Sequence, residues 1–104
     1  PYALGALAQE AGGLSGKPLM ALSTRILADM ARALKGAVPL IGAGGILSSA
    51  DAYAKILHGA TAVQIYSGMV YRGPQLAHTI NQTLPHLLDC DGFDHVSDAV
   101  GAAL

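Results

Sequence analysis

The sequence of 104 residues has little charge, one cysteine and no tryptophan. The single cysteine, Cys90, excludes an internal disulfide framework and a zinc site built on several cysteines. Six basic and seven acidic residues give a net charge of −1, so we expect no nucleic-acid partner. No apolar run approaches the roughly 20 residues that a membrane-spanning helix needs. The stretch after Pro1 has no basic segment followed by an apolar one, so we expect no targeting signal there.

The residues that are present are mostly apolar. Hydrophobic residues make up 52% of the chain and charged residues 12%, where soluble domains usually have about 25% charged residues. High hydrophobicity with low net charge excludes intrinsic disorder. A chain of this composition either buries more surface than a small domain can, or has its surface covered by something else, so we expect a piece of a larger protein.

Apolar periodicity predicts helices and strands in alternation. Spacings of three and four residues predict helices over 24–35, between Ser49 and Gly59, over 75–88 with a kink or break at Pro85, and over 94–102. Short uncharged apolar runs predict strands over 38–43 and 61–66, each buried on both faces, with a short helical segment at 69–71. Ser23 or Thr24 is the expected cap of the first helix, and Ser48 or Ser49 that of the second.

Strands that alternate with helices indicate right-handed βαβ units in a parallel sheet. A complete (β/α)8 barrel takes about 250 residues, so this chain holds about three of its units. Two or three strands cannot close a barrel and would leave exposed edges. We therefore predict an α/β fold, namely the C-terminal portion of a TIM (β/α)8 barrel with about its last two to three βα units. Residues 1–104 would all belong to that single domain.

Two glycine-containing turns follow the two predicted strands, Gly44-Gly45 and Ser67-Gly68. Backbone N–H groups in such turns bind anions, because glycine has no Cβ to keep a ligand away. In βα barrels the last two βα loops and a short extra helix commonly bind phosphate, which matches this order. Tight turns alone are the alternative for any single glycine. Under the phosphate interpretation, an aspartate at Gly45 would put a charged side chain into the anion site.

Other polar and aromatic residues give weaker indications. Tyr66 ends the second strand and either stacks on a flat cofactor or packs at the barrel end. Lys17 is either solvated or in contact with a phosphate. The histidines at 58, 78, 86 and 95 are scattered and predict no metal site. Cys90 has no nearby base and is not expected to be a nucleophile, so we assign no catalytic residue.

Several motifs in register resemble the C-terminal part of dihydroorotate dehydrogenase. They are GGLSGKPL at 12–19, PLIGAGGI at 39–46 and VQIYSG at 63–68, followed by Gly73-Pro74. The KPL form at 17–19 and the tail around 96–101 resemble the quinone-dependent class 2 enzymes. The resemblance implies oxidation of dihydroorotate to orotate with FMN and quinone, in pyrimidine biosynthesis. It also implies peripheral membrane contact through segments absent here, at the cytoplasmic face if the protein is bacterial.

The resemblance also implies roles for particular residues. The FMN phosphate would rest on the loops that match Gly44-Gly45 and Tyr66-Ser67-Gly68, and the glycine that matches Gly16 would contact the cofactor. The catalytic serine of the family lies upstream of the matched motifs, so we expect this chain to lack the base and to be inactive alone. The alternatives are another FMN-dependent βα-barrel oxidoreductase and a non-catalytic fragment that binds phosphate or a nucleotide.

Overall fold

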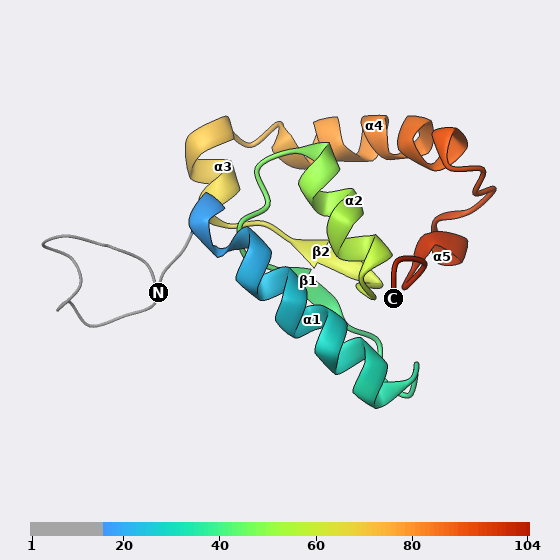
Figure 1. Ribbon diagram of the computed structural model, residues 1–104. Coiled ribbons are helices and arrows are strands. Elements are labelled where there is room, and N and C mark those ends of the chain that lie inside the picture. The colour runs from blue at the N-terminus through green and yellow to red at the C-terminus, as the bar shows by residue number, and fades with distance from the viewer. Residues whose placement is uncertain (1–15) are drawn as a thin grey trace, which may run out of the picture.

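A computed structural model describes residues 16–104, so the first four residues of the motif at 12–19 lie outside the described part. Helices and two short strands alternate along the chain (Figure 1). In order they are the short 3-10 helix η2 (Lys17–Leu19), α1 (Met20–Leu34), β1 (Ile41–Ala43), α2 (Ser49–Leu57), β2 (Ala62–Gln64), α3 (Ser67–Arg72), α4 (Leu76–Cys90) and α5 (Val96–Ala99). The predicted alternation of helices and strands is confirmed.

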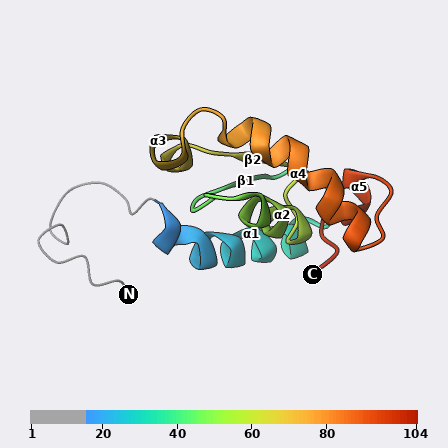
Figure 2. The same ribbon diagram turned by 90° about the horizontal axis from the view of Figure 1, so that it is seen from above.

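The two strands form a parallel pair joined by α2, with Gly42 opposite Val63 in the register. Helix α2 contacts both strands and lies between α1 and α4 (Figures 1 and 2). Side chains of successive strand residues point to opposite faces, so only alternate positions meet the helices. Gly42 is buried, whereas Ile41 in the same strand is 63% exposed.

The prediction of strands buried on both faces is therefore wrong for the part of the chain that the structure describes. The helices cover one face of the two-stranded sheet, and no other element among residues 16–104 covers the face that carries Ile41. In a closed barrel that face would be the filled interior, which needs side chains from other strands.

The core lies between α2 and its neighbours in two adjoining clusters. One cluster joins Ala52 of α2 to Leu76 and Ile80 of α4. The other joins Tyr53 and Ile56 of α2 to residues of α4 and α5. The sequence prediction of a buried stripe on this helix is confirmed for Tyr53 and Ile56, whereas Leu57 is half-buried.

Helix α1 differs most from its prediction. It begins at Met20 and has Leu19 at its N-cap position without a side-chain cap, so Ser23 and Thr24 lie inside the helix and the predicted cap is wrong. The 3-10 turn η2 leads directly into α1, so the backbone is already helical before Ser23, the first residue that could have served as a cap. At the other end the prediction holds, because Gly36 has a φ of +81° just after the last helical turn.

The remaining helices follow the sequence more closely. Ser48 caps α2, its hydroxyl accepting a hydrogen bond from the Asp51 N–H at 3.2 Å, as predicted. The short helical segment after β2 is present as α3, and α4 runs through Pro85 without a break. The final helix is shorter than predicted and covers only Val96–Ala99.

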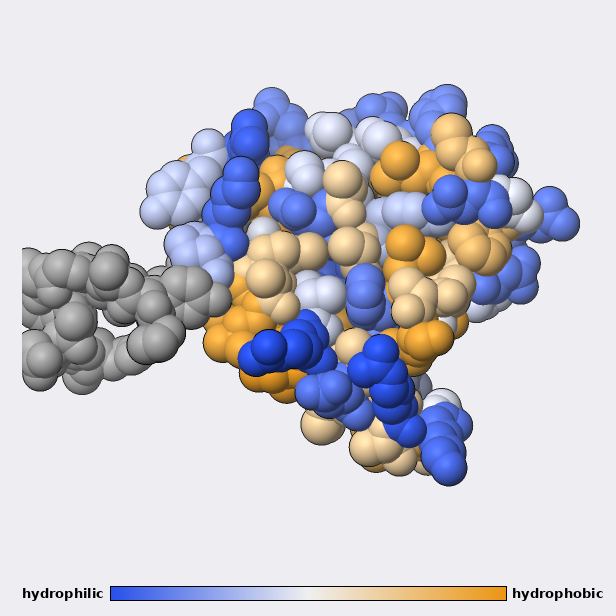
Figure 3. All heavy atoms as spheres, in the orientation of Figure 1, coloured by the Kyte–Doolittle hydropathy of each residue, from blue (hydrophilic) through white to orange (hydrophobic). Residues whose placement is uncertain are grey.

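Large apolar side chains remain exposed over several elements, and Figure 3 shows orange hydrophobic residues open to solvent between the charged ones. Val70 and Tyr71 of α3 are about three-quarters exposed, at 74% and 75%. Exposed apolar surface of this extent is unusual for a free-standing domain and marks contact with further protein or with a ligand. Among residues 16–104, no helix is both long and apolar enough to cross a membrane.

Candidate functional site

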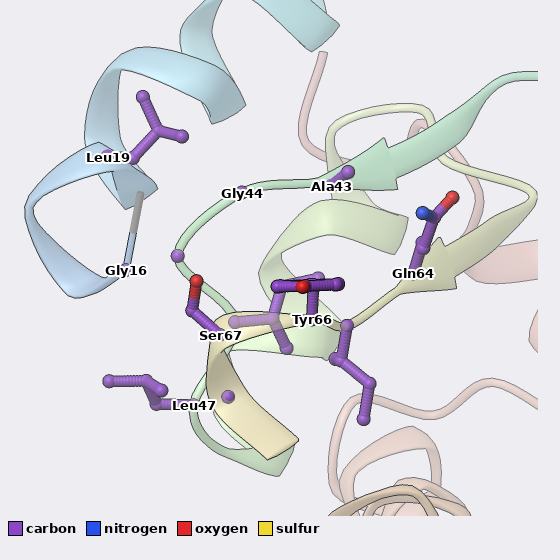
Figure 4. A pocket seen from close by; sticks show the side chains of 12 residues that line it. Gly16, Leu19, Ala43, Gly44, Leu47, Gln64, Tyr66 and Ser67 are labelled. Carbon is purple, nitrogen blue, oxygen red and sulfur yellow. The ribbon is translucent and has the colours of Figure 1, made fainter. Parts of the chain in front are cut away.

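A pocket of about 200 Å³ opens at the edge of the sheet where both strands end (Figure 4). All six residues that the sequence proposed for cofactor binding line it. These six are Gly16, Gly44, Gly45, Tyr66, Ser67 and Gly68. The other residues that line the pocket are Leu19, Ala43, Ile46, Leu47, Gln64 and Ile65. The structure thus brings the two glycine corners and Gly16 to one place, while their binding role stays a prediction.

The parallel register accounts for this meeting. Ala43 pairs with Gln64 at the carboxyl ends of the two strands, so the chain leaves both strands at the same edge of the sheet. The corner after β1, Gly44-Gly45, leads to α2, and the corner after β2 leads directly into α3. In α/β folds, ligands bind outside the carboxyl ends of parallel strands.

The glycines at the corners are required by the packing of the protein on itself. Gly45 has a φ of +81°, and a Cβ built on it would lie 2.5 Å from both the Met20 Cα and N atoms at the start of α1. A Cβ on Gly68 would fall within 3.0 Å of both the Ile46 carbonyl oxygen and a methyl group of Leu76. Glycine at these two positions lets α1, the first corner and α3 approach one another.

This packing corrects the expected effect of an aspartate at Gly45. The Cβ at this position would point at the backbone of Met20, so the substitution would first push α1 away from the corner rather than place a charge in the pocket. The pocket would lose its shape for a steric reason, whatever the charge of the new side chain.

The pocket wall offers hydrogen-bond donors and no negative charge. The backbone N–H groups of Gly45, Ser67 and Gly68 donate no hydrogen bond to an acceptor within residues 16–104. The Ser67 side chain is half-buried at the same wall. Among residues 16–104, no aspartate or glutamate lines the pocket. Unbonded N–H groups that line a pocket without a carboxylate beside them suit the oxygens of an anion.

Tyr66 stands at the mouth of this pocket and is 81% exposed. Its hydroxyl makes no hydrogen bond to another residue in the described range. The alternative of a ring packed at the barrel end with a bonded hydroxyl is therefore not realised within residues 16–104. An exposed ring beside an anion-binding corner is free to contact a flat ligand.

Sequence reasoning missed Lys55, which lies behind the first corner. Its side chain is fully buried, and its ammonium group donates a hydrogen bond to the Ser23 hydroxyl at 2.5 Å. The Ser23 hydroxyl in turn donates to the Gly44 carbonyl oxygen at 3.0 Å. Burial lowers the pKa of Lys55 below 10.5, and the negative charge of Asp51 opposes this effect. The sequence did offer a signal for Lys55, because it is a charged residue beside the predicted buried stripe of α2.

The other residues singled out in the sequence lie elsewhere. Lys17 is exposed and lines a separate groove along α1. Cys90 is exposed at the end of α4. Over residues 16–104, no three His, Cys, Asp or Glu side chains come together as a metal-binding group.

Comparison with known proteins decides the family. The model of the dihydroorotate dehydrogenase family matches residues 4–88. The chain belongs to this family. It is 54% identical over 98 residues to the dihydroorotate dehydrogenase (quinone) of Parvibaculum lavamentivorans, which covers 94% of this chain and 28% of the relative. It is 52% identical over 96 residues to the mitochondrial dihydroorotate dehydrogenase (quinone) of Arabidopsis thaliana, which covers 92% of this chain and 21% of the relative.

Solved structures give the same result for the fold. The crystal structure of a dihydroorotate dehydrogenase from Eimeria tenella in complex with ferulenol superposes with a TM-score of 0.87 at 41% identity, covering 95% of this chain and 26% of that one. The resemblance seen in the sequence and the predicted partial TIM barrel are both confirmed. The chain spans about a quarter of the length of the curated relatives that it matches.

Proposed function

We propose that residues 1–104 are the C-terminal part of a single FMN-binding βα-barrel domain, and that this part holds the FMN phosphate in a quinone-dependent dihydroorotate dehydrogenase. The observation that carries the proposal is the pocket at the ends of β1 and β2. There two neighbouring corners, each with unbonded amides, line one pocket, and no carboxylate among residues 16–104 lines it. The similarity to dihydroorotate dehydrogenases (quinone) supports the choice of reaction.

The pocket fits one end of such a cofactor. Sites that enclose a whole drug-sized ligand usually measure about 300–1,000 Å³. The pocket of about 200 Å³ is smaller than these and suits a phosphate group, with the rest of the ligand lying outside it. A phosphate carries up to two negative charges, which the donors of the pocket wall would stabilise through charge-assisted hydrogen bonds.

Each residue of the site has a definite task in this proposal. The amides of Gly45 and Gly68 donate to phosphate oxygens, Ser67 adds its amide and its hydroxyl, and Gly44 lines the pocket beside them without a side chain. Gly16 closes the pocket from the side of η2, where its carbonyl oxygen accepts a hydrogen bond from the Leu19 N–H at 3.0 Å. Bound FMN would supply the flavin ring that takes up a hydride from dihydroorotate and is reoxidised by quinone.

This chain contributes binding and orientation to the reaction, and we assign none of its residues to proton abstraction. The open face of the sheet, with Ile41 63% exposed, and the exposed apolar residues of α3 are the surfaces that the remaining units of a barrel would cover. The base, the groups that hold dihydroorotate and the peripheral membrane contact would all come from those other segments.

The proposal is tested with the full-length protein that contains this chain. We expect purified protein to carry a yellow chromophore that is released on denaturation and chromatographs as FMN. Dihydroorotate should bleach the flavin absorbance, and a quinone should restore it. Protein without flavin, or with a flavin that dihydroorotate does not bleach, would contradict the proposal. As a control, the 104-residue chain alone should not turn over dihydroorotate.

A further inference from the structure

Lys55 is the one charged side chain that is buried among residues 16–104, and its relative exposure is 0%. It makes no ion pair with a carboxylate within 4.0 Å in this part of the chain. Its ammonium group donates to a neutral hydroxyl, that of Ser23. Burying a cation without a carboxylate partner costs free energy, and an apolar side chain of similar length would avoid that cost.

The strand beside Lys55 is shaped around its side chain. A Cβ built on Gly42 in β1 would lie 3.0 Å from the Lys55 Cβ and 3.3 Å from its Cγ. The φ of Gly42 is not in the left-handed region, so backbone conformation does not demand a glycine at this position. The glycine therefore leaves room for the lysine and for Ala60, whose Cβ would be equally close.

The chain of hydrogen bonds from Lys55 ends at the pocket. Ser23 accepts from the ammonium group and donates to the Gly44 carbonyl oxygen, and Gly44 lines the pocket. The cation thus lies two hydrogen bonds from the corner whose amides face the proposed phosphate. The Ser23 hydroxyl also lies 3.2 Å from the Met20 carbonyl oxygen, which ties the same group to the start of α1.

We propose that Lys55 is a positioning residue for the phosphate of the ligand. It holds the Gly44-Gly45 corner in place through Ser23, and its buried positive charge favours a doubly negative group in the pocket. The inference rests on the proposed function, and it adds a residue that does not line the pocket. Its charge is buried in protein rather than surrounded by water, and electrostatic interactions are stronger there.

The test compares two flavins that differ in the phosphate group, FMN and riboflavin. Lys55→Met keeps the length of the side chain and removes its charge and its donors. In the full-length protein stripped of flavin, we expect this variant to bind FMN about tenfold or more weakly, and riboflavin within about twofold of the unchanged protein. Lys35→Met, the same change at an exposed lysine beyond the end of α1, should alter neither affinity.

If Lys55 had a merely structural role, Lys55→Met would weaken the binding of FMN and of riboflavin by the same factor. This result, or an unchanged preference for FMN over riboflavin, would overturn the inference. If Lys55→Met does not accumulate as folded protein, the same two affinities are measured for Ser23→Ala. It keeps the cation but removes the link to Gly44, so it should also lower the affinity for FMN more than that for riboflavin, and equal effects would overturn the inference. Unchanged protein that binds no FMN would instead refute the proposed function.

Discussion

Replacement of Gly68 by alanine tests whether the pocket depends on the close approach of its two corners. The new Cβ would fall within 3.0 Å of the Ile46 carbonyl oxygen and 2.9 Å from a Leu76 methyl group. The φ of Gly68 is not in the left-handed region, so the substitution adds no left-handed backbone strain to this steric contact. The first turn of α3 must therefore move away from the corner that follows β1.

The size of the effect comes from two opposing contributions. Forcing an extra methyl group into a packed site costs about 1–3 kcal/mol. Alanine in a helix gains about 0.5–1 kcal/mol over glycine, which offsets part of this cost. We expect a net loss of about 1–2 kcal/mol in the free energy of unfolding. A displaced α3 also misaligns the Ser67 and Gly68 amides, and each hydrogen bond to a charged group is worth about 1.5–3 kcal/mol.

The assay measures the dissociation constant for FMN and the unfolding free energy of the same full-length variants. Gly68→Ala should weaken FMN binding by about tenfold or more. The matched control is Gly36→Ala, because Gly36 has a φ of +81° and no neighbouring atom within 4 Å of a built Cβ. Left-handed strain should destabilise this variant by about 1–2 kcal/mol without moving the pocket.

The two variants separate pocket geometry from general stability. Both should unfold more easily, and only Gly68→Ala should lose FMN affinity. The reasoning is refuted if Gly68→Ala binds FMN like the unchanged protein, or if Gly36→Ala loses affinity to the same extent.

Two further predictions follow from the packing around the site and from the core. Gly45→Ala and Gly45→Asp should both abolish flavin retention, because the Cβ itself meets the Met20 backbone, and an alanine variant that keeps its FMN would contradict this explanation. Burial, together with the hydrogen bond to Asp91 and its charge, raises the pKa of Tyr53 from 10.0 to about 12. Because the unfolded chain then loses this proton first, stability should fall as the pH rises from 10.0 to about 12. Denaturant unfolding should show a smaller alkaline fall in Tyr53→Phe, whereas Tyr71→Phe, at an exposed position, should retain it.

Features that depend on neighbouring residues could be predicted from the sequence alone. The buried positions Tyr53 and Ile56 recur at helical spacing, and Ser48 stands where a helix cap is needed. The order of strand, glycine corner and helix could also be predicted, because glycine placement and apolar periodicity determine local structure within a few residues. Parallel strands place their carboxyl ends at one edge, so the meeting of the two corners also followed from the sequence.

Contacts between distant parts of the chain decided the rest. Ser23 became a link between Lys55 and Gly44 because α1 starts earlier than its polar residues indicate, and nothing near Ser23 in the sequence signals either partner. The direction of a Cβ at Gly45 depends on where α1 lies. Local periodicity reports which face of an element is apolar, but it carries no information on which other element lies against that face. Only the tertiary structure supplies that partner.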